Sequence, residues 1–325
     1  MARSELSVPA RLYRGFPWLL ACCGAVGAYL LMSGGTYLAV AELVLTVAHR
    51  AGVDIADPAT LATFDLWFQF GSQLASALLF WLWWRILTPR QVSYARRGLL
   101  RRDAASIVRR LVALALLGVV IQMLVSVVLT LMVSLLPQVM QNYRDTMEAA
   151  GTTDFSLITV LVVGLGAPLL EETMCRGVLL EFALRAVCPE WRAAWRRGAP
   201  RDERWRARSR RVPAARFWLA NGIQAALFGL LHGNIVQTCY AFLIGLALGA
   251  LFWRTGRLRY NMMLHGVVNI ASYAVNAIWG ALAGLGLIGM VVVLVAVGAF
   301  AVDLYRAGTV AFAGALPAAG ETEAR

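Results

Sequence analysis

The sequence predicts an all-α membrane protein, a polytopic transmembrane helical bundle of about eight spans with both termini in the cytoplasm. Of its 325 residues, 60% are hydrophobic and 15% are charged, and the mean hydropathy is +0.66. One soluble core of this length buries far less apolar mass, so lipid is expected to surround the surplus. The apolar residues also gather in runs of about 20, the length at which a helix crosses a hydrocarbon layer of about 30 Å.

Eight such apolar runs follow one another along the chain. They cover residues 17–47, 64–87, 111–136, 155–180, 217–231, 235–253, 262–282 and 285–302. The first run has a basic start but no small-residue cleavage site, so we expect a retained span rather than a signal peptide. The chain then divides into an N-terminal segment with three helices, a core of four helices, and a last helix with a short tail, at 1–154, 155–282 and 283–325.

The basic residues indicate the orientation in the membrane. All 30 are arginines, and they give a net charge of +12. They gather in alternate loops, with eight from Arg85 to Arg110 and eleven from Arg185 to Arg216. Cytoplasmic loops retain positive charge, so the alternation places these loops and both termini in the cytoplasm of a multi-pass protein of the cell (plasma or inner) membrane.

The loop 185–216 interleaves tryptophan with arginine, a pattern also found in nucleic-acid surfaces. Beside a membrane span the same pattern fits the headgroup layer, where the rings lie at the interface and the cations meet anionic lipid. We therefore expect membrane lipid and a peptide or protein substrate as partners, and no nucleic acid. The sequence does not indicate the oligomeric state.

Charged residues inside the fourth span need a specific reason, because a charge at the centre of a lipid-facing helix costs roughly 2.5 to 3.5 kcal/mol. Glu171, Glu172 and Arg176 lie within six residues there. Glu172 and Arg176 are four apart and share a helix face, so they are expected to form an ion pair. Glu171 is then free to face a cavity. A packing network between helices, or a place at the cytoplasmic end of the span, would explain the same charges without chemistry.

Two of the three histidines also lie inside spans, each with a partner four residues away on the same face. Phe228 precedes His232 in the fifth span, and Asn269 follows His265 in the seventh. A lone helical histidine is more often a hydrogen-bonded core residue than a catalyst, but two of them make coincidence a weaker explanation. His49, at the outer end of the first span, is expected to be interfacial.

These side chains match the needs of amide hydrolysis, which requires a base for water, donors for the oxyanion and an acid for the leaving amine. Glu171, with Glu172 beside it, is the expected base, and His232 is expected to orient the water or carry the proton. His265 and Asn269 are the expected oxyanion donors. Straight helices would leave His232 near the far end of its span, so that span must begin late or be displaced for the groups to meet.

At these residues the sequence resembles the CaaX protease and bacteriocin-processing family, which includes the type II CaaX prenyl endopeptidases. Three motifs occur in the family's order: Glu-Glu-x-x-x-Arg at 171–176, Phe-x-x-x-His at 228–232 and His-x-x-x-Asn at 265–269. The resemblance covers about 157–274. It implies an eight-helix fold with a cavity open to the cytoplasm and cleavage of membrane-associated, CaaX-like or leader peptides. It also implies that the glutamates and first histidine activate water, with the last histidine and asparagine as the oxyanion site.

Members of this family are often labelled metalloproteases, and Glu171, His232 and His265 could hold zinc with one position open for water. The sequence has no His-Glu-x-x-His pair, and these ligands would come from three helices. We therefore expect no cofactor, with zinc as the alternative. Two other functions stay open: a non-catalytic membrane scaffold or bacteriocin self-immunity protein with the same fold, and a proton-coupled transporter, although no inverted repeat is visible.

Overall fold

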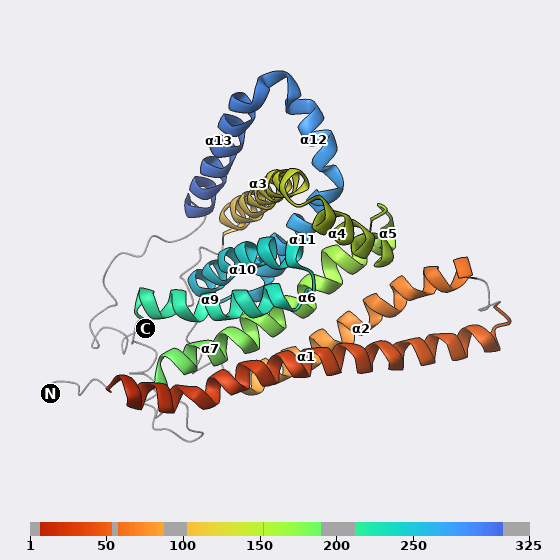
Figure 1. Ribbon diagram of the computed structural model, residues 1–325, viewed down its shortest axis with the longest axis horizontal. Helices are drawn as coiled ribbons and strands as arrows, with labels where there is room; N and C mark the ends of the chain where they lie inside the picture. Colours follow the sequence, from red (N-terminus) through yellow and green to blue (C-terminus); the bar gives the residue numbers. More distant parts are fainter. Residues whose placement is uncertain (1–6, 54–57, 88–102, 152, 190–211, 308–325) are drawn as a thin grey trace.

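The computed structural model is helical, and the residues that it describes contain no strand (Figure 1). The described residues are 7–53, 58–87, 103–151, 153–189 and 212–307. Most of the arginine-rich loops and the C-terminal tail lie outside these ranges. The orientation inferred from their charges, with both termini in the cytoplasm, stays a prediction.

Each predicted span corresponds to a helix or to a run of joined helices. These are α1 (Val8–Arg50), α2 (Pro58–Leu87), α3 (Ala104–Leu135), the run Leu157–Val187, α9 (Ala214–Leu230), α10 (Ile235–Thr255), the run Leu258–Leu285 and α13 (Gly286–Ala307). Among the described residues, six of the eight are long and apolar enough to cross a membrane. The chain is thus a multi-pass helical membrane protein, as predicted.

The count of eight crossings stays a prediction, because α2 and α9 are not among those six helices. Helix α9 has 17 residues, and α2 has 30 but carries polar side chains through its middle. The sequence analysis also missed α4 (Pro137–Ala149), a short polar helix that begins at a proline after α3. A proline is well tolerated at a first helical position, where its missing amide costs no hydrogen bond.

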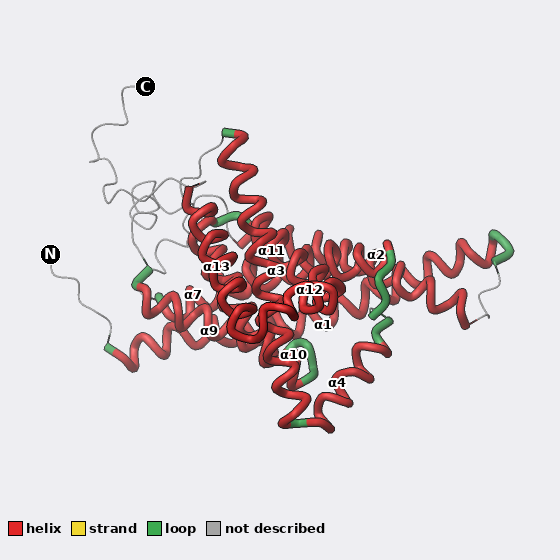
Figure 2. Tube along the Cα trace, turned by 90° about the horizontal axis from the view of Figure 1, so that it is seen from above, coloured by secondary structure: helices red, strands yellow, loops and turns green. Residues whose placement is uncertain are grey.

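The run Leu157–Val187 lies between two groups of helices (Figure 1). On one side α1 and α2 run along each other, and on the other side α9, α10 and α11 (Leu258–Ala271) pack together. Helix α3 packs against α11 and α13, and Figure 2 shows α4 beside the end of α10. The run that carries both glutamates is therefore enclosed by helices from both ends of the chain.

The largest hydrophobic cluster surrounds the C-terminal half of this run. Met174 and Leu179 are fully buried at its centre, and Phe80 of α2 and Phe217 of α9 close it from either side. Between membrane helices, where lipid is as apolar as leucine, such contacts stabilise chiefly through close packing. The glutamates at 171 and 172 lie at the edge of this cluster, so their helix is firmly held.

Candidate active site

The glutamate motif lies on a short α-helical segment flanked by two π-helices. Helix α6 (Ala167–Glu172) follows η1 (Val160–Gly166) and precedes η2 (Thr173–Leu179), after which α7 (Leu180–Val187) completes the run. In the π pattern the amide of Ala167 donates to the carbonyl of Val162, five residues earlier. Such wide turns free backbone groups and occur frequently at functional sites.

Glu172 and Arg176 form the ion pair that their spacing predicted. Arg176 Nη1 lies 2.8 Å from Glu172 Oε1, and both side chains are fully buried. Arg176 Nη2 also donates to the Gly245 carbonyl of α10 at 3.2 Å, and its guanidinium lies 4.6 Å from the centroid of the Phe228 ring. A buried charge is tolerated only when it is paired and hydrogen-bonded, and this arginine meets both conditions.

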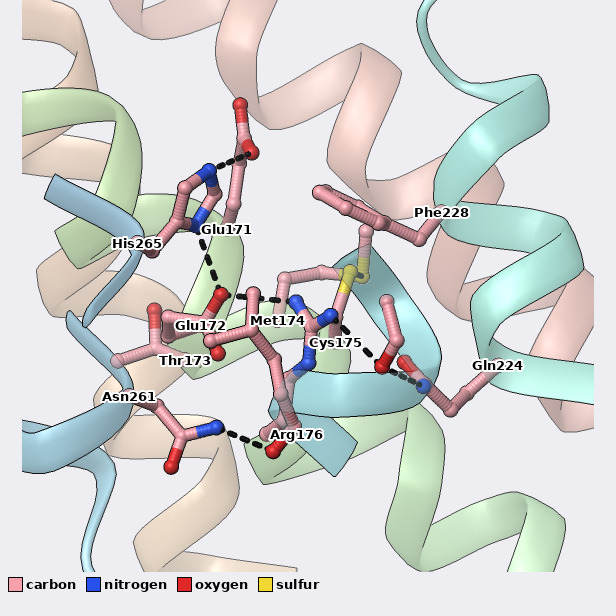
Figure 3. Close-up of polar contacts among 12 residues, drawn as sticks. Glu171, Glu172, Thr173, Met174, Cys175, Arg176, Gln224, Phe228, Asn261 and His265 are labelled. Carbon is pink, nitrogen blue, oxygen red and sulfur yellow. Dashed lines mark hydrogen bonds and ion pairs between the residues drawn. The ribbon is translucent and has the colours of Figure 1, made fainter. Parts of the chain in front are cut away.

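His265 joins this pair from α11 (Figure 3). Its Nδ1 donates to Glu172 Oε1 at 2.8 Å, so one carboxylate oxygen accepts from both the arginine and the histidine. Its Nε2 lies 3.7 Å from Glu171 Oε2, too long for a direct hydrogen bond. The imidazole is therefore held between the two glutamates.

Glu171 differs from its neighbour in exposure. Its side chain is 18% exposed, whereas that of Glu172 is 0% exposed. One helix position, about 100° of rotation, separates the two side chains, as the sequence analysis predicted. Glu171 is therefore the more accessible of the two glutamates, and Glu172 is the one fixed by Arg176.

Asn269 binds the backbone of η1, and Pro168 explains why. In the π pattern the next amide after Ala167 would donate to the Val163 carbonyl, but position 168 is a proline and has no N–H. Asn269 Nδ2 supplies the missing donor at 2.8 Å from Val163 O. One hydrogen of the amide is thus used structurally, and the other remains for an oxyanion.

A glycine allows α11 to approach η1 this closely. A Cβ atom at Gly266, next to His265, would lie 2.4 Å from the Gly164 carbonyl oxygen, which is backbone and cannot turn away. A Cβ at Gly229 would lie 2.7 Å from the Thr238 carbonyl oxygen. Both glycines therefore permit close packing between helices.

His232 lies in the turn after α9, and its position differs from the expectation. The helix begins at Ala214, before the predicted start at 217, so it does not begin late. His232 Nδ1 donates to the Phe228 carbonyl at 2.9 Å, which leaves Nε2 for any role in chemistry. The Phe228 ring makes edge contacts with both histidines, with centroid distances of 5.0 Å to His232 and 6.0 Å to His265. Phe228 contacts both histidines, and His265 contacts the glutamates, so Phe228 connects His232 to the rest of the site.

Two amide side chains outside the three motifs, Gln224 of α9 and Asn261 of α11, form hydrogen bonds near the site. Gln224 Nε2 donates to the same Gly245 carbonyl as Arg176, at 3.0 Å, and Asn261 Nδ2 donates to the Leu248 carbonyl at 2.6 Å. Both residues are fully buried (Figure 3). In the sequence each of them is a polar residue inside an apolar run, and this is the pattern that also indicated the glutamates.

A cavity of about 760 Å³ lies beyond Asn269, at the α4 end of the bundle. It is lined by α4, by residues 153–155 before α5 (Leu157–Thr159) and by the turn after α11, and includes Tyr143, Glu148, Phe155 and Tyr273. Ser272, another lining residue, donates to the Asn269 carbonyl at 2.6 Å. The cavity is therefore one helical turn from the asparagine of the third motif.

Residues 153–271 match the model of the family described as type II CAAX prenyl endopeptidase Rce1-like. We call this matched stretch the Rce1-like segment. The predicted resemblance is thereby confirmed, with limits close to the expected 157–274. The Rce1-like segment contains all three motifs, and α1 to α4 precede it. Comparisons with curated proteins and with solved structures find no match.

The zinc alternative can be tested against the donor groups of the Rce1-like segment. The described residues contain no group of three or more side chains of His, Cys, Asp or Glu placed to share a metal ion. His265 Nδ1 and His232 Nδ1 are hydrogen-bonded, so only their Nε2 atoms would be available to a metal. Because Glu171, His232 and His265 do not form such a group in the described part of the chain, they do not fit a zinc site.

Proposed function

We propose that the protein is an intramembrane endopeptidase that hydrolyses peptide bonds of membrane-associated, CaaX-like or leader peptides with water activated by Glu171. The observation that carries this proposal is the division of roles between adjacent glutamates. Glu172 is buried and held by Arg176 and His265, whereas Glu171 is partly exposed beside the imidazole. The Rce1-like match supports a protease as the class of enzyme.

In this mechanism Glu171 takes a proton from a water molecule as the water oxygen attacks the carbonyl carbon of the peptide. The carbon–nitrogen bond then breaks, and the proton passes from Glu171 to the leaving amine, so that one water is consumed for each bond cut. The hydrogen bond from His265 Nδ1 to Glu172 fixes the imidazole, so that Nε2 faces the carboxylate of Glu171. Fixed polar groups of this kind need no reorganisation during the reaction.

Two further groups serve the oxyanion and the water. The second amide hydrogen of Asn269 is the proposed oxyanion donor, held in place by the first hydrogen's bond to Val163. The Nε2 atom of His232 is the proposed contact for the water or the substrate, since Nδ1 is bound to its own helix. Each preorganised donor of this type contributes about 10²-fold to 10³-fold in rate.

The test compares membrane peptides from cells that produce the wild-type protein or the Glu171→Gln variant. We expect at least one cleavage product that is present with wild type and missing with Glu171→Gln. Glu42→Gln is the matched control, since Glu42 is an exposed residue of α1 outside the site. Identical peptide sets from all three would contradict the proposal and favour a non-catalytic membrane scaffold or self-immunity protein.

A further inference from the structure

Helices α1 and α2, which precede the Rce1-like segment, each carry a stripe of polar side chains within an apolar span. On α1 the stripe consists of Tyr29, Ser33, Thr36 and Tyr37, and on α2 it consists of Asp65, Gln69, Ser72, Gln73 and Ser76. The intervals of three and four residues place each set on one helix face. Polar side chains are costly at this depth in a membrane, and residues that persist there are typically functional.

The two stripes face each other and form one polar seam. Thr36 Oγ1 and Ser76 Oγ are 2.7 Å apart, and Thr36 also donates to the Ser72 carbonyl at 3.3 Å. Nearer the hairpin end, the Tyr37 hydroxyl donates to Asp65, which also accepts from Gln69 Nε2 at 2.7 Å. These contacts turn the polar face of α1 toward α2, and the two helices run along each other in Figure 1.

Two oxygen atoms of the seam are buried without a partner. Among the described residues, neither Ser33 Oγ nor Gln73 Oε1 has a hydrogen bond. A buried polar atom left unpaired costs about 1 to 3 kcal/mol, and a bound water is the usual remedy. Gln73 Oε1 lies against Gly166 of η1, where an added Cβ would be only 2.0 Å away. The glycine therefore leaves space for the amide beside the run that carries the glutamates.

The register between α1 and the glutamate run brings the inner end of the seam to Glu171. Three successive contacts define it: Gly15 with the Ala186 carbonyl, Trp18 with Phe182 at 5.7 Å, and Cys22 Sγ with the Leu179 carbonyl at 4.0 Å. From Gly15 to Cys22 the helix α1 advances seven residues, and from Ala186 to Leu179 the run goes back seven. Seven residues beyond Cys22, the same register places Tyr29 level with the glutamate pair.

We propose that this seam supplies water to Glu171. Water enters between Tyr37 and Asp65, binds the free oxygens of Ser33 and Gln73, and reaches Glu171 beside Tyr29. The path from the level of Tyr37 to that of Tyr29 covers eight residues, or about 12 Å. The inference rests on the proposed function, because a hydrolase enclosed in lipid must import one water for each bond cut. It also gives α1 and α2 a role in that reaction.

The competing explanation is that the polar residues merely join α1 to α2 by hydrogen bonds. Two double variants separate the explanations. Ser33→Leu with Gln73→Leu fills the seam with apolar volume, whereas Ser33→Ala with Gln73→Ala removes the same polar atoms but leaves room for water. Ala39→Leu, on an exposed face of α1, is the control for added volume.

The readout is hydroxyl-radical labelling by X-ray pulses of the protein in lipid nanodiscs, because radicals formed from bound water oxidise the nearest side chains. Tyr29 is compared with Phe80, which is fully buried and has its ring centroid 6.3 Å away. We expect Tyr29 to be oxidised severalfold faster than Phe80 in wild type, in the alanine pair and in Ala39→Leu, and to fall to the rate of Phe80 in the leucine pair. Slow oxidation of Tyr29 in wild type, or unchanged oxidation in the leucine pair, would overturn the proposal.

Cleavage assays complete the test. The leucine pair should lower kcat severalfold with KM unchanged, whereas the control Ala39→Leu, which lies outside the seam, should retain kcat. The labelling is repeated in Glu171→Gln, where cleavage is not needed for the readout. A failure of the water path then appears as an unlabelled Tyr29 in the wild type and in Glu171→Gln. A failure of the proposed function appears as a labelled Tyr29 in a wild-type protein that cleaves nothing, or in a Glu171→Gln variant that cleaves as fast as wild type.

Discussion

His265 Nδ1 and Arg176 Nη1 both donate to the same oxygen of Glu172, each at 2.8 Å. All three side chains are buried. This shared contact joins α11 to the segment that carries the glutamates, 93 residues earlier in the chain. It fixes Glu172 as the partner of two donors and leaves Glu171 outside both hydrogen bonds.

Removing the charge of Glu172 should destabilise the fold. Glu172→Gln leaves the Arg176 guanidinium without its counter-ion, and breaking a buried pair in this way costs about 3 to 5 kcal/mol. The free energy of unfolding in mild detergent measures the effect. The double variant Glu172→Gln with Arg176→Met should recover much of the loss, because it removes the unpaired charge as well. An unchanged stability of Glu172→Gln would show that the pair is not important for the fold.

Gly266→Ala should disturb both stability and cleavage. Its methyl group would meet the Gly164 carbonyl at 2.4 Å, so α11 must shift away from η1 and carry His265 with it. Gly222→Ala is the matched control: Gly222 lies within α9 and an added Cβ meets nothing within 4 Å. A helical Gly→Ala change without a clash typically stabilises by about 0.5 to 1 kcal/mol. Equal behaviour of the two variants would rule out close packing at Gly266.

Pro168 and Asn269 should be energetically coupled. Asn269→Ala leaves the Val163 carbonyl without a donor, at a cost of about 1 to 3 kcal/mol. In a Pro168→Ala background, residue 168 has an N–H that can donate to the Val163 carbonyl. Asn269→Ala should then lower the free energy of unfolding by less. A double-mutant cycle on unfolding free energies measures the difference, which for residues sharing one partner is about 0.5 to 3 kcal/mol. Strict additivity would contradict this explanation of the π-helix.

The two histidines should respond differently to substitution. His265→Ala removes a buried partner of Glu172 and should lower both stability and cleavage. His232→Ala removes a ring whose hydrogen bond at Nδ1 goes to the Phe228 carbonyl of the same helix. The free energy of unfolding should therefore change little. Its cleavage rate should nevertheless fall, by about 10²-fold to 10⁴-fold if the ring takes part in proton transfer. Normal cleavage by His232→Ala would remove this residue from the mechanism.

The helices and the ion pair were predictable because each depends on local spacing. Apolar runs of membrane length predicted the helices, and the four-residue interval predicted the contact of Glu172 with Arg176. The π-helices were not predicted, since a wider turn leaves no periodic signal in so short a segment. Pro168 was nevertheless a clue, because a proline inside a helix frees a carbonyl that another group must satisfy.

The convergence of the site could be predicted only in part. The order of the three motifs indicated that His265 meets the glutamates, which the structure confirms, but no spacing fixes a contact across 93 residues. Asn269 was predicted as an oxyanion donor, and its bond to Val163 depends on a π-helix that the sequence analysis did not foresee. His232 was expected on a late or displaced helix, whereas α9 begins early and Phe228 lies between the two histidines.

The most direct measurement is the initial rate at which purified protein in lipid vesicles cleaves a peptide identified from the membrane comparison, with wild type and Glu171→Gln side by side. Because Glu171 is partly exposed and outside the Arg176 ion pair, the variant should unfold at the wild-type temperature. Its rate should fall by about 10²-fold to 10⁴-fold, as expected when a general base is lost. A folded Glu171→Gln variant that cleaves at the wild-type rate would contradict the assignment of the water-activating base.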